Sequence, residues 1–262
     1  MHGILFAVIV AFGVAVSACG RDAIVRDAGR PNAATLLPAD LGVGTGVAMV
    51  LRGRSRRVDV YSRGDDADRP SRAEDLVDVV SLLAGLRTGV IDEHTVHRCN
   101  GLNCSRAHGD VTAAQALSLS CLHFFDDLGS RIGADALAPA FLALGLTPPA
   151  IPADRDARVR LASRGEGWSV SPRQLLPLAR ALRDHAAPWS PVFDQALIPA
   201  VGEPASLRGK AAGTGEISGW FVGYASTGEA SLVVVRVSRC VEMCAARAIS
   251  VARWAVAHRS VR

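Results

Sequence analysis

The order in which strand-like and helix-like segments follow one another restricts the fold of this chain more than any single motif does. Thr45–Leu51 is rich in β-branched and apolar residues, and Val58–Ser62 alternates apolar with polar residues, which predicts a β-hairpin. Trp220–Ala225 and Ser231–Ser238 also have the character of strands, and Ala245–Ala257 has that of a closing helix. Helical patterns fill the middle of the chain. The sequence therefore predicts an α+β domain with an antiparallel sheet flanked by helices.

The clearest helical pattern begins shortly after Ser71. Apolar residues recur at helical spacing from Leu76 to Leu86, and Gly89 stands where a helix-ending glycine is expected. Ser71 and Glu74 predict a capping box, in which each side chain accepts a hydrogen bond from a backbone N–H group at the start of the helix. Two further helices are expected over Thr112–Leu128 and Pro172–Asp184.

The N-terminus has the pattern of an export signal. Ile4–Val16 is uncharged and apolar, and Val16-Ser17-Ala18-Cys19 is similar to the lipobox of bacterial lipoproteins. The similarity implies cleavage before Cys19 and a membrane anchor made of acyl chains on that cysteine. The alternative is an uncleaved anchor, since Met1–Ala18 is just long enough to span a bilayer. Either arrangement places the folded part outside the cytoplasm, facing the periplasm or the cell exterior.

One folded domain accounts for the length of the chain. With 262 residues and 49% hydrophobic content, the chain can bury one sizeable core. Residues 19 to about 40 are polar and alanine-rich and show no sustained periodicity, which is typical of a tether. We therefore expect a signal peptide over residues 1–18, a lipid-anchored linker over 19–41 and a single domain over 42–262.

An exported chain can keep disulfides, so its cysteines are first considered as bridges. Cys99 and Cys104 bracket a short loop that could close on itself, and Cys240 and Cys244 would share a helix face. Cys121 lies in an apolar helical run, and we expect it to be a buried free thiol.

Five runs, taken in order, resemble the penicillin-binding transpeptidase and class D β-lactamase superfamily, and the resemblance extends over nearly all of the chain from Thr45 to Val261. They are Leu82–Asp92, the loop with Cys99, Gly101 and His108-Gly109, the segment Ala116–Gly133, Val170–Leu175, and Leu207–Tyr224. The resemblance implies the fold of that superfamily and a groove lined by its three motifs.

In that family a serine is acylated, a lysine one helical turn away takes its proton, a Ser-x-Asn motif relays protons, and a Lys-Thr-Gly strand binds the substrate carboxylate. By the family's spacing the serine and lysine positions fall on Asp75 and Asp78. Two carboxylates cannot replace a nucleophilic hydroxyl and an amine base. Lys210 is the only lysine of the chain and Leu207 stands three residues before it, so the sequence contains no Ser-x-x-Lys.

Ser71 is a weak candidate for a nucleophile. It lies four residues, about one helical turn, before Asp75, so a helix extended by a turn would place it on the same face as Glu74, which could act as a base. The capping box explains the same pair and is the preferred interpretation. No intact catalytic residue is therefore predicted.

The second and third motifs survive in part. Ser120 begins the run Ser-Cys-Leu, where the family has an amide in place of Leu122. Lys210 and Thr214 are separated by one residue more than in Lys-Thr-Gly-Thr, and a one-residue shift turns a side chain to the other face of a strand. Either a bulge lets Lys210 reach the groove, or Gly213-Thr214 keeps the groove and the lysine turns away. Ser120, Lys210, Gly213 and Thr214 are the candidate binding residues.

Other classes of ligand are not favoured. His94, His97, Cys99, Cys104 and His108 lie close together in sequence, but their spacing fits no standard zinc pattern, and the resemblance accounts for two of them. We therefore expect no metal and no cofactor. The net charge of +4 is small and the arginines between residues 52 and 56 are typical of a solvated turn, so no nucleic-acid partner is expected either.

These observations predict an exported lipoprotein with a catalytically degenerate penicillin-binding-type domain, a pseudoenzyme that acts at the cell wall. Its partner would be a peptidoglycan stem peptide or another envelope protein. The strand that contains Gly213 would pair with an extended peptide at the sheet edge. The alternative is an active serine-type DD-transpeptidase or DD-peptidase that binds penicillin and acts in peptidoglycan synthesis. Covalent labelling by a β-lactam distinguishes the two.

Overall fold

A computed structural model describes residues 35–53, 57–184, 190–197, 199–200, 207–226 and 231–258. The signal peptide expected over residues 1–18 and the expected lipid site Cys19 both lie outside these ranges. Within them, no helix combines the length and the apolar character needed to cross a bilayer.

The main sheet has seven strands, and all of its neighbouring pairs are antiparallel except that of β1 with β3. In spatial order its strands are β1 (Thr35–Leu36), β3 (Val58–Arg63), β2 (Val43–Arg52), β11 (Ser231–Cys240), β10 (Ser218–Ala225), β9 (Leu207–Thr214) and β8 (Pro199–Ala200). The hairpin and the strand pair expected near the two ends of the chain are thus confirmed as β2–β3 and β10–β11.

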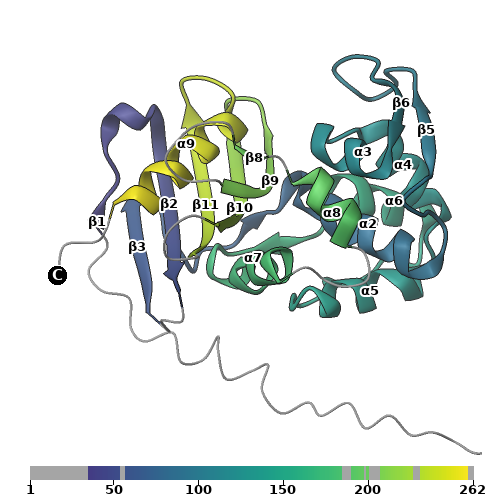
Figure 1. Ribbon diagram of the computed structural model, residues 1–262, viewed down its shortest axis with the longest axis horizontal. Helices are drawn as coiled ribbons and strands as arrows, with labels where there is room; N and C mark the ends of the chain where they lie inside the picture. The colour runs from purple at the N-terminus through teal and green to yellow at the C-terminus, as the bar shows by residue number, and fades with distance from the viewer. Residues whose placement is uncertain are drawn as a thin grey trace, which may run out of the picture.

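The sheet is buried on both faces, which explains its continuous runs of valine and other apolar residues. On β10, Trp220 and Val222 face the helical layer, whereas Phe221 faces the C-terminal helix α9 (Cys244–Ala257). Figure 1 shows α9 lying across one face of the sheet, and α7 (Leu176–Arg183) packs against β10 and β11 from the other. Gly219 permits the close approach of α9, because a Cβ there would lie 2.4 Å from the Cys244 carbonyl carbon.

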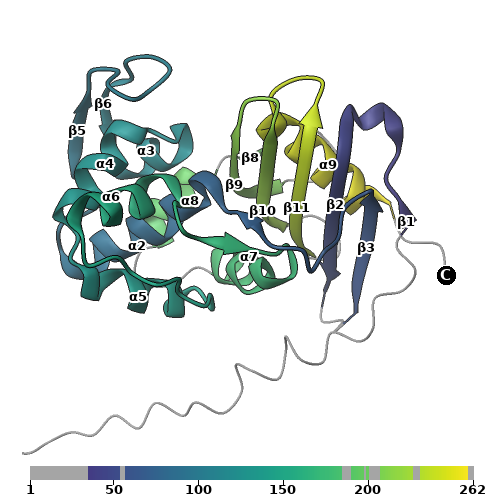
Figure 2. The same ribbon diagram turned by 180° about the vertical axis from the view of Figure 1, so that it is seen from behind.

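The remaining helices form a layer of their own on the side of the sheet near β9, as both Figure 1 and Figure 2 show. They are α2 (Val77–Thr88), α3 (Ala113–Leu119), α4 (Leu122–Arg131), α5 (Ala134–Ala143), α6 (Arg155–Arg164) and α8 (Ser190–Ala196). Helix α2 packs against α4, α5 and α6, and its residues from Val77 to Leu86 are buried. A helix that is apolar almost all round belongs in the centre of a core. The expected stop at Gly89 is confirmed by its left-handed conformation, φ 68°.

Three short 3₁₀ helices and two small sheets complete the described chain. They are η1 (Ala39–Leu41), η2 (Glu74–Leu76), η3 (Arg173–Leu175), the pair β4 (Ser71–Arg72) with β7 (Ser169–Val170), and the pair β5 (Val96–Cys99) with β6 (Gly109–Thr112). The domain includes residues before Gly42, since β1 joins the sheet and Leu37 is fully buried.

The single helix expected over Thr112–Leu128 is wrong. The structure has two helices, α3 and α4, because Ser120 adopts the left-handed conformation, with φ 48°, and ends α3. Thr112 and Gln115 form a capping box that begins α3.

The capping box expected from Ser71 and Glu74 is also wrong. Ser71 lies in the short strand β4, paired with Val170, and its hydroxyl accepts a hydrogen bond of 3.1 Å from Arg236. The carboxylate of Glu74 bonds to side chains of the sheet instead. Contacts distant in sequence therefore override a local pattern that would otherwise begin a helix.

Of the expected disulfides, the structure forms one. Cys240 and Cys244 are bonded, which ties the end of β11 to the start of α9. The bridge expected between Cys99 and Cys104 is wrong, since both are free thiols whose sulfurs lie 3.7 Å apart. Cys121 is a buried free thiol, as expected.

Candidate functional site

Lys210 reaches the helical layer from a regular strand. Strand β9 pairs residue for residue with β10 from Leu207 to Thr214, so no bulge accommodates the extra residue of the third motif. Lys210 is paired with Val222, which faces the helical layer, and Thr214, four residues further on, is on the same face. Neither of the two expected alternatives is found: Lys210 does not turn away, and it reaches the helical layer without a bulge. The lysine and the threonine lie on the same face of β9.

The ammonium group of Lys210 has three oxygen neighbours. It donates hydrogen bonds to the Leu117 carbonyl at 2.7 Å and to the Ser120 hydroxyl at 2.5 Å, and it lies 3.5 Å from Oδ2 of Asp78. Leu117 and Ser120 belong to the C-terminal end of α3, where unpaired carbonyls favour a cation. Lys210 is 4% exposed and Asp78 is 2% exposed. The structure thus brings together the predicted residues Ser120 and Lys210 around a buried ion pair.

Asp75 lies in η2, which packs against β9, and Asp78 lies in the first turn of α2. Burial raises the pKa of Asp75, and the nearby Lys210 ammonium opposes this rise. Burial also raises the pKa of Asp78 well above its usual value, and Lys210 again acts in the opposite direction. Each carboxyl therefore lies in surroundings that disfavour its charge, and Lys210 is the cation that compensates for it.

Glu74 contributes a second contact between the helical layer and the sheet. Its carboxylate accepts hydrogen bonds from the hydroxyls of Thr214 at 2.8 Å and Ser218 at 3.0 Å. Its backbone has φ 54°, a value uncommon for a residue with a side chain. The predicted binding residue Thr214 is exposed, but its hydroxyl is already paired with this carboxylate. Gly213, beside it, is opposite Gly219 on β10.

Ser71, the weak candidate for a nucleophile, is held apart from this group. Its hydroxyl accepts from Arg236 of β11, a buried guanidinium that also pairs with Asp65 and donates to the backbone of Arg69. Ser71 is thus part of a structural contact between β4 and the sheet. Nothing in the local sequence around Ser71 indicates this partner, which lies far along the chain.

The histidines and cysteines near residue 100 separate into three groups. His94 lies 3.5 Å from Glu93, and His97 contacts His123 at 3.2 Å through their ring nitrogens. The others, Cys99, Cys104 and His108, meet Cys121, which the sequence analysis did not associate with them. Cys121 is separated from His108 by β6 and α3, so sequence spacing gave no signal for this contact.

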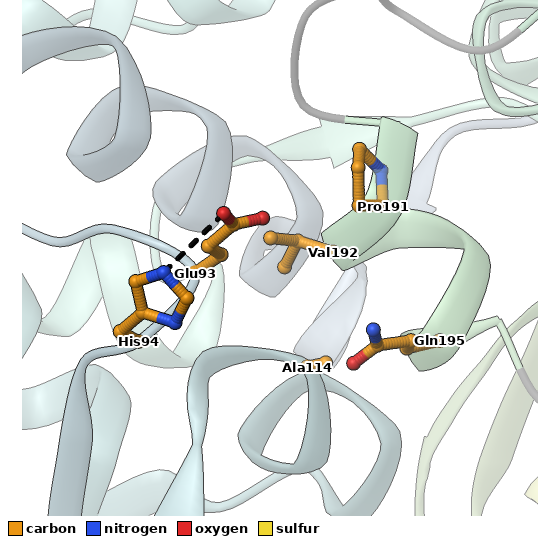
Figure 3. Close-up of a pocket in the computed structure, with 6 residues that line it drawn as sticks. All are labelled: Glu93, His94, Ala114, Pro191, Val192 and Gln195. Carbon is orange, nitrogen blue, oxygen red and sulfur yellow. Dashed lines mark ion pairs between the residues drawn. The ribbon is translucent and has the colours of Figure 1, made fainter.

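A pocket of about 250 Å³ lies away from Lys210. It is lined by Glu93, His94, Ala114, Pro191, Val192 and Gln195, as Figure 3 shows. The pocket lies between the loop before β5, the start of α3 and helix α8. Because it contains none of the residues that surround Lys210, we place the candidate site at Lys210 and not in this pocket.

No protein-family profile and no curated protein sequence matches the chain. Solved structures do match it. The C-terminal domain of the Bacillus licheniformis BlaR penicillin-receptor superposes with a TM-score of 0.68 at 15% identity, over 87% of this chain and 97% of that one. The class D β-lactamase YbXI from Nostoc gives 0.65 at 20% identity, over 82% and 93%. A class D β-lactamase from Bacillus subtilis gives 0.61 at 21%, over 79% and 88%.

The chain has a β-lactamase-like fold. Identities this low establish the fold and leave the chemistry to be argued from the residues. In this β-lactamase-like domain the groups beside β9 include the Lys210 ammonium, the hydroxyls of Ser120, Thr214 and Ser218, and the carboxyl groups of Glu74, Asp75 and Asp78. Carboxyl groups and an ammonium that already donates to oxygen atoms can bind and orient a ligand, but they do not constitute an activated nucleophile.

We expect Lys210→Met to destabilise the domain by about 3–5 kcal/mol near neutral pH, because it leaves a buried carboxyl without its cation. Loss of the ammonium raises the pKa of Asp78 further, so the folded variant retains a proton that the wild type releases. Both proteins therefore lose stability as the pH rises above the pKa of an unfolded aspartate, about 3.9, but the loss stops at the folded pKa of Asp78, which is higher in the variant. The difference in stability between wild type and variant should widen with pH in urea titrations.

The matched control is Lys210→Met/Asp78→Asn, which has no carboxyl at position 78 to titrate. The difference between the unfolding free energies of the double and the single variant should grow as the pH rises toward the folded pKa of Asp78 in the single variant. A difference between wild type and Lys210→Met that is independent of pH from about pH 4 upward would contradict the ion pair.

Proposed function

We propose that this chain is a cell-envelope lipoprotein whose penicillin-binding-like domain does not acylate and instead binds a peptide or another envelope protein. The observation that carries the proposal is the pairing of Lys210 with Asp78. In the family that the sequence resembles, the position of Asp78 belongs to the lysine that takes the proton from the nucleophile. A carboxyl group there is paired with the sole lysine of the chain, whose three N–H bonds have oxygen neighbours.

The contacts of Glu74 support the same proposal. In the resembling family the Lys-Thr-Gly strand binds the carboxylate of the substrate. Here Thr214 and its neighbour across the strands, Ser218, both donate to the carboxylate of Glu74. A side chain of the protein itself thus takes the place of an anionic ligand group. Asp75 and Asp78 add to the repulsion that an incoming carboxylate would meet.

The edge of the sheet is the part of the domain that we propose for recognition. Strand β8 pairs with β9 only at Leu207 and Arg208, so within the described ranges the stretch from Gly209 to Thr214 has a strand partner on one side only. Unpaired backbone groups at a sheet edge can receive an extended peptide as an added strand. A peptidoglycan stem peptide or an extended segment of an envelope protein fits this mode, which relies on backbone contacts and needs no clamp for a terminal carboxylate.

Incubation of the protein with a fluorescent penicillin should give no covalent adduct, because the sequence has no Ser-x-x-Lys pair and the Ser120 hydroxyl accepts from an ammonium, which is not a base. Intact-mass measurement checks the result, with a known penicillin-binding protein labelled in the same tube. A stoichiometric adduct that disappears in Ser71→Ala or in Ser120→Ala would overturn the non-acylating proposal and identify the nucleophile.

A stem pentapeptide should bind no more tightly than its C-terminal amide, since Glu74 occupies the place of the terminal carboxylate. In Glu74→Gln the repulsion is reduced, and we expect the free-acid peptide to gain about tenfold in affinity relative to the amide, which corresponds to about 1.4 kcal/mol. Fluorescence anisotropy measures both peptides. The control is Glu93→Gln, a substitution of the same type at the remote pocket. If neither peptide binds the wild type or Glu74→Gln, the stem peptide is eliminated as the ligand.

The proposed anchor is tested in a bacterial host supplied with an alkyne-tagged fatty acid. The wild type should carry the label and sediment with membranes, because the cysteine of a lipobox carries acyl chains in the mature lipoprotein. Cys19→Ser should carry no label. A labelled Cys19→Ser variant, or an unlabelled wild type that keeps residues 1–18, would rule out this anchor.

A further inference from the structure

Three thiols and one imidazole converge beside the β5–β6 hairpin. Cys99 ends β5, Cys104 and His108 lie in the loop that leads to β6, and Cys121 immediately precedes α4. Their sulfur and ring-nitrogen atoms all lie within 4.8 Å of one another. Cys99 and Cys121 are buried, and Cys104 and His108 are half-buried. The group therefore faces the interior of the helical layer and is not part of the exposed surface.

Three of the distances in this group match the edges of a tetrahedron around a zinc ion. With Zn–S bonds of about 2.3 Å and a Zn–N bond of about 2.0–2.1 Å, tetrahedral geometry places two sulfurs roughly 3.8 Å apart, and a sulfur and a nitrogen roughly 3.6 Å apart. The Cys99–Cys104 and Cys104–Cys121 sulfurs are separated by 3.7 and 3.8 Å, and the Cys99 sulfur lies 3.6 Å from Nδ1 of His108. A disulfide would require about 2.05 Å.

Backbone donors surround the sulfurs, as expected for metal-bound thiolates. The N–H group of His123 donates to the Cys104 sulfur at 3.4 Å. The backbone N–H groups of Gly101 and His108 hydrogen-bond to Cys99, and that of Phe124 hydrogen-bonds to Cys121. Outer hydrogen bonds of this kind orient ligands and stabilise their charge in metal sites. Three neighbouring thiols with such donors form a preorganised set of soft ligands.

We propose that Cys99, Cys104, Cys121 and His108 bind one Zn²⁺ ion in a closed structural site. Four protein ligands leave no open position for water or substrate, so the ion stabilises the fold and takes no part in a reaction. It fastens the β5–β6 hairpin and its loop to the start of α4. Cys121 directly follows Ser120, the residue whose left-handed turn ends α3 and whose hydroxyl accepts from Lys210. Zinc thus holds one side of the turn that positions Ser120.

The test uses the full chain, extracted in detergent under reducing conditions with zinc present and then dialysed against a weak chelator. Elemental analysis should find about one zinc per chain, and Co²⁺ substitution should give the thiolate charge-transfer and intense d–d bands of a tetrahedral site. Cys99→Ser, Cys121→Ser and His108→Ala should each reduce the retained zinc to near zero. The matched control, Cys240→Ser/Cys244→Ser, removes the disulfide and should retain the full amount.

Two results would overturn the proposal. One is a wild-type chain that retains no zinc and gives no tetrahedral cobalt spectrum. The other is zinc that remains bound in all three ligand variants. The cobalt spectrum of the wild type decides the matter even if a ligand variant does not fold. These measurements do not depend on whether the groove binds a peptide, so failure of that proposal leaves this one intact.

Discussion

The arrangement of sheet and helices depends on the contacts between the buried Lys210 ammonium and the oxygen atoms around it. Removing an ammonium from water costs several kcal/mol unless oxygen atoms replace its hydration shell. The oxygens come from separate elements, namely the end of α3 for Leu117 and Ser120, and the first turn of α2 for Asp78. These elements must meet at β9 for the charge to be tolerated. The left-handed turn at Ser120, which divides the expected long helix, is part of that requirement.

A second buried cation acts in the same way between β11 and the segment before α2. Arg236 of β11 is buried, pairs with Asp65 and donates to Ser71 and to backbone carbonyls of the preceding segment. Its guanidinium carbon lies 5.6 Å from the ring centre of Trp220, whose indole N–H donates to the Arg72 carbonyl. The segment that leads into α2 is therefore bound to the sheet before α2 begins. Glu74 completes this connection through Thr214 and Ser218.

The sequence predicts those parts of the fold that local periodicity determines, and it fails where distant side chains decide. Strands β2, β3, β10 and β11, helix α2 with its glycine stop, and α9 follow from patterns of apolar residues. Ser71 and Glu74 have a sound local pattern for a cap, yet Arg236 and Thr214 bind them from strands far along the chain. Helix α6 has charged residues on much of its surface and α5 contains Pro139, so neither segment has a clear helical periodicity of apolar residues.

The candidate site likewise contains residues that the sequence predicts and residues that only the tertiary structure identifies. The resemblance placed Asp78 and Ser120 at motif positions and left the direction of Lys210 open, and the structure brings Lys210 into contact with both. Glu74 acts as an internal carboxylate, and Cys121 meets the cysteines near residue 100. Both contacts depend on the path of the chain between elements. Neither has a signature in sequence spacing, because the partners are joined by segments whose course only the tertiary structure fixes.

The position of Lys210 also determines how the domain responds to amine chemistry. It is the only lysine of the chain, and its side chain is 4% exposed at the junction of β9, α2 and α3. A reagent that acylates primary amines can reach it only when these three elements separate. The rate of such labelling at Lys210 therefore reports the opening of this junction in the otherwise intact protein, from a single natural probe that needs no engineered substitution.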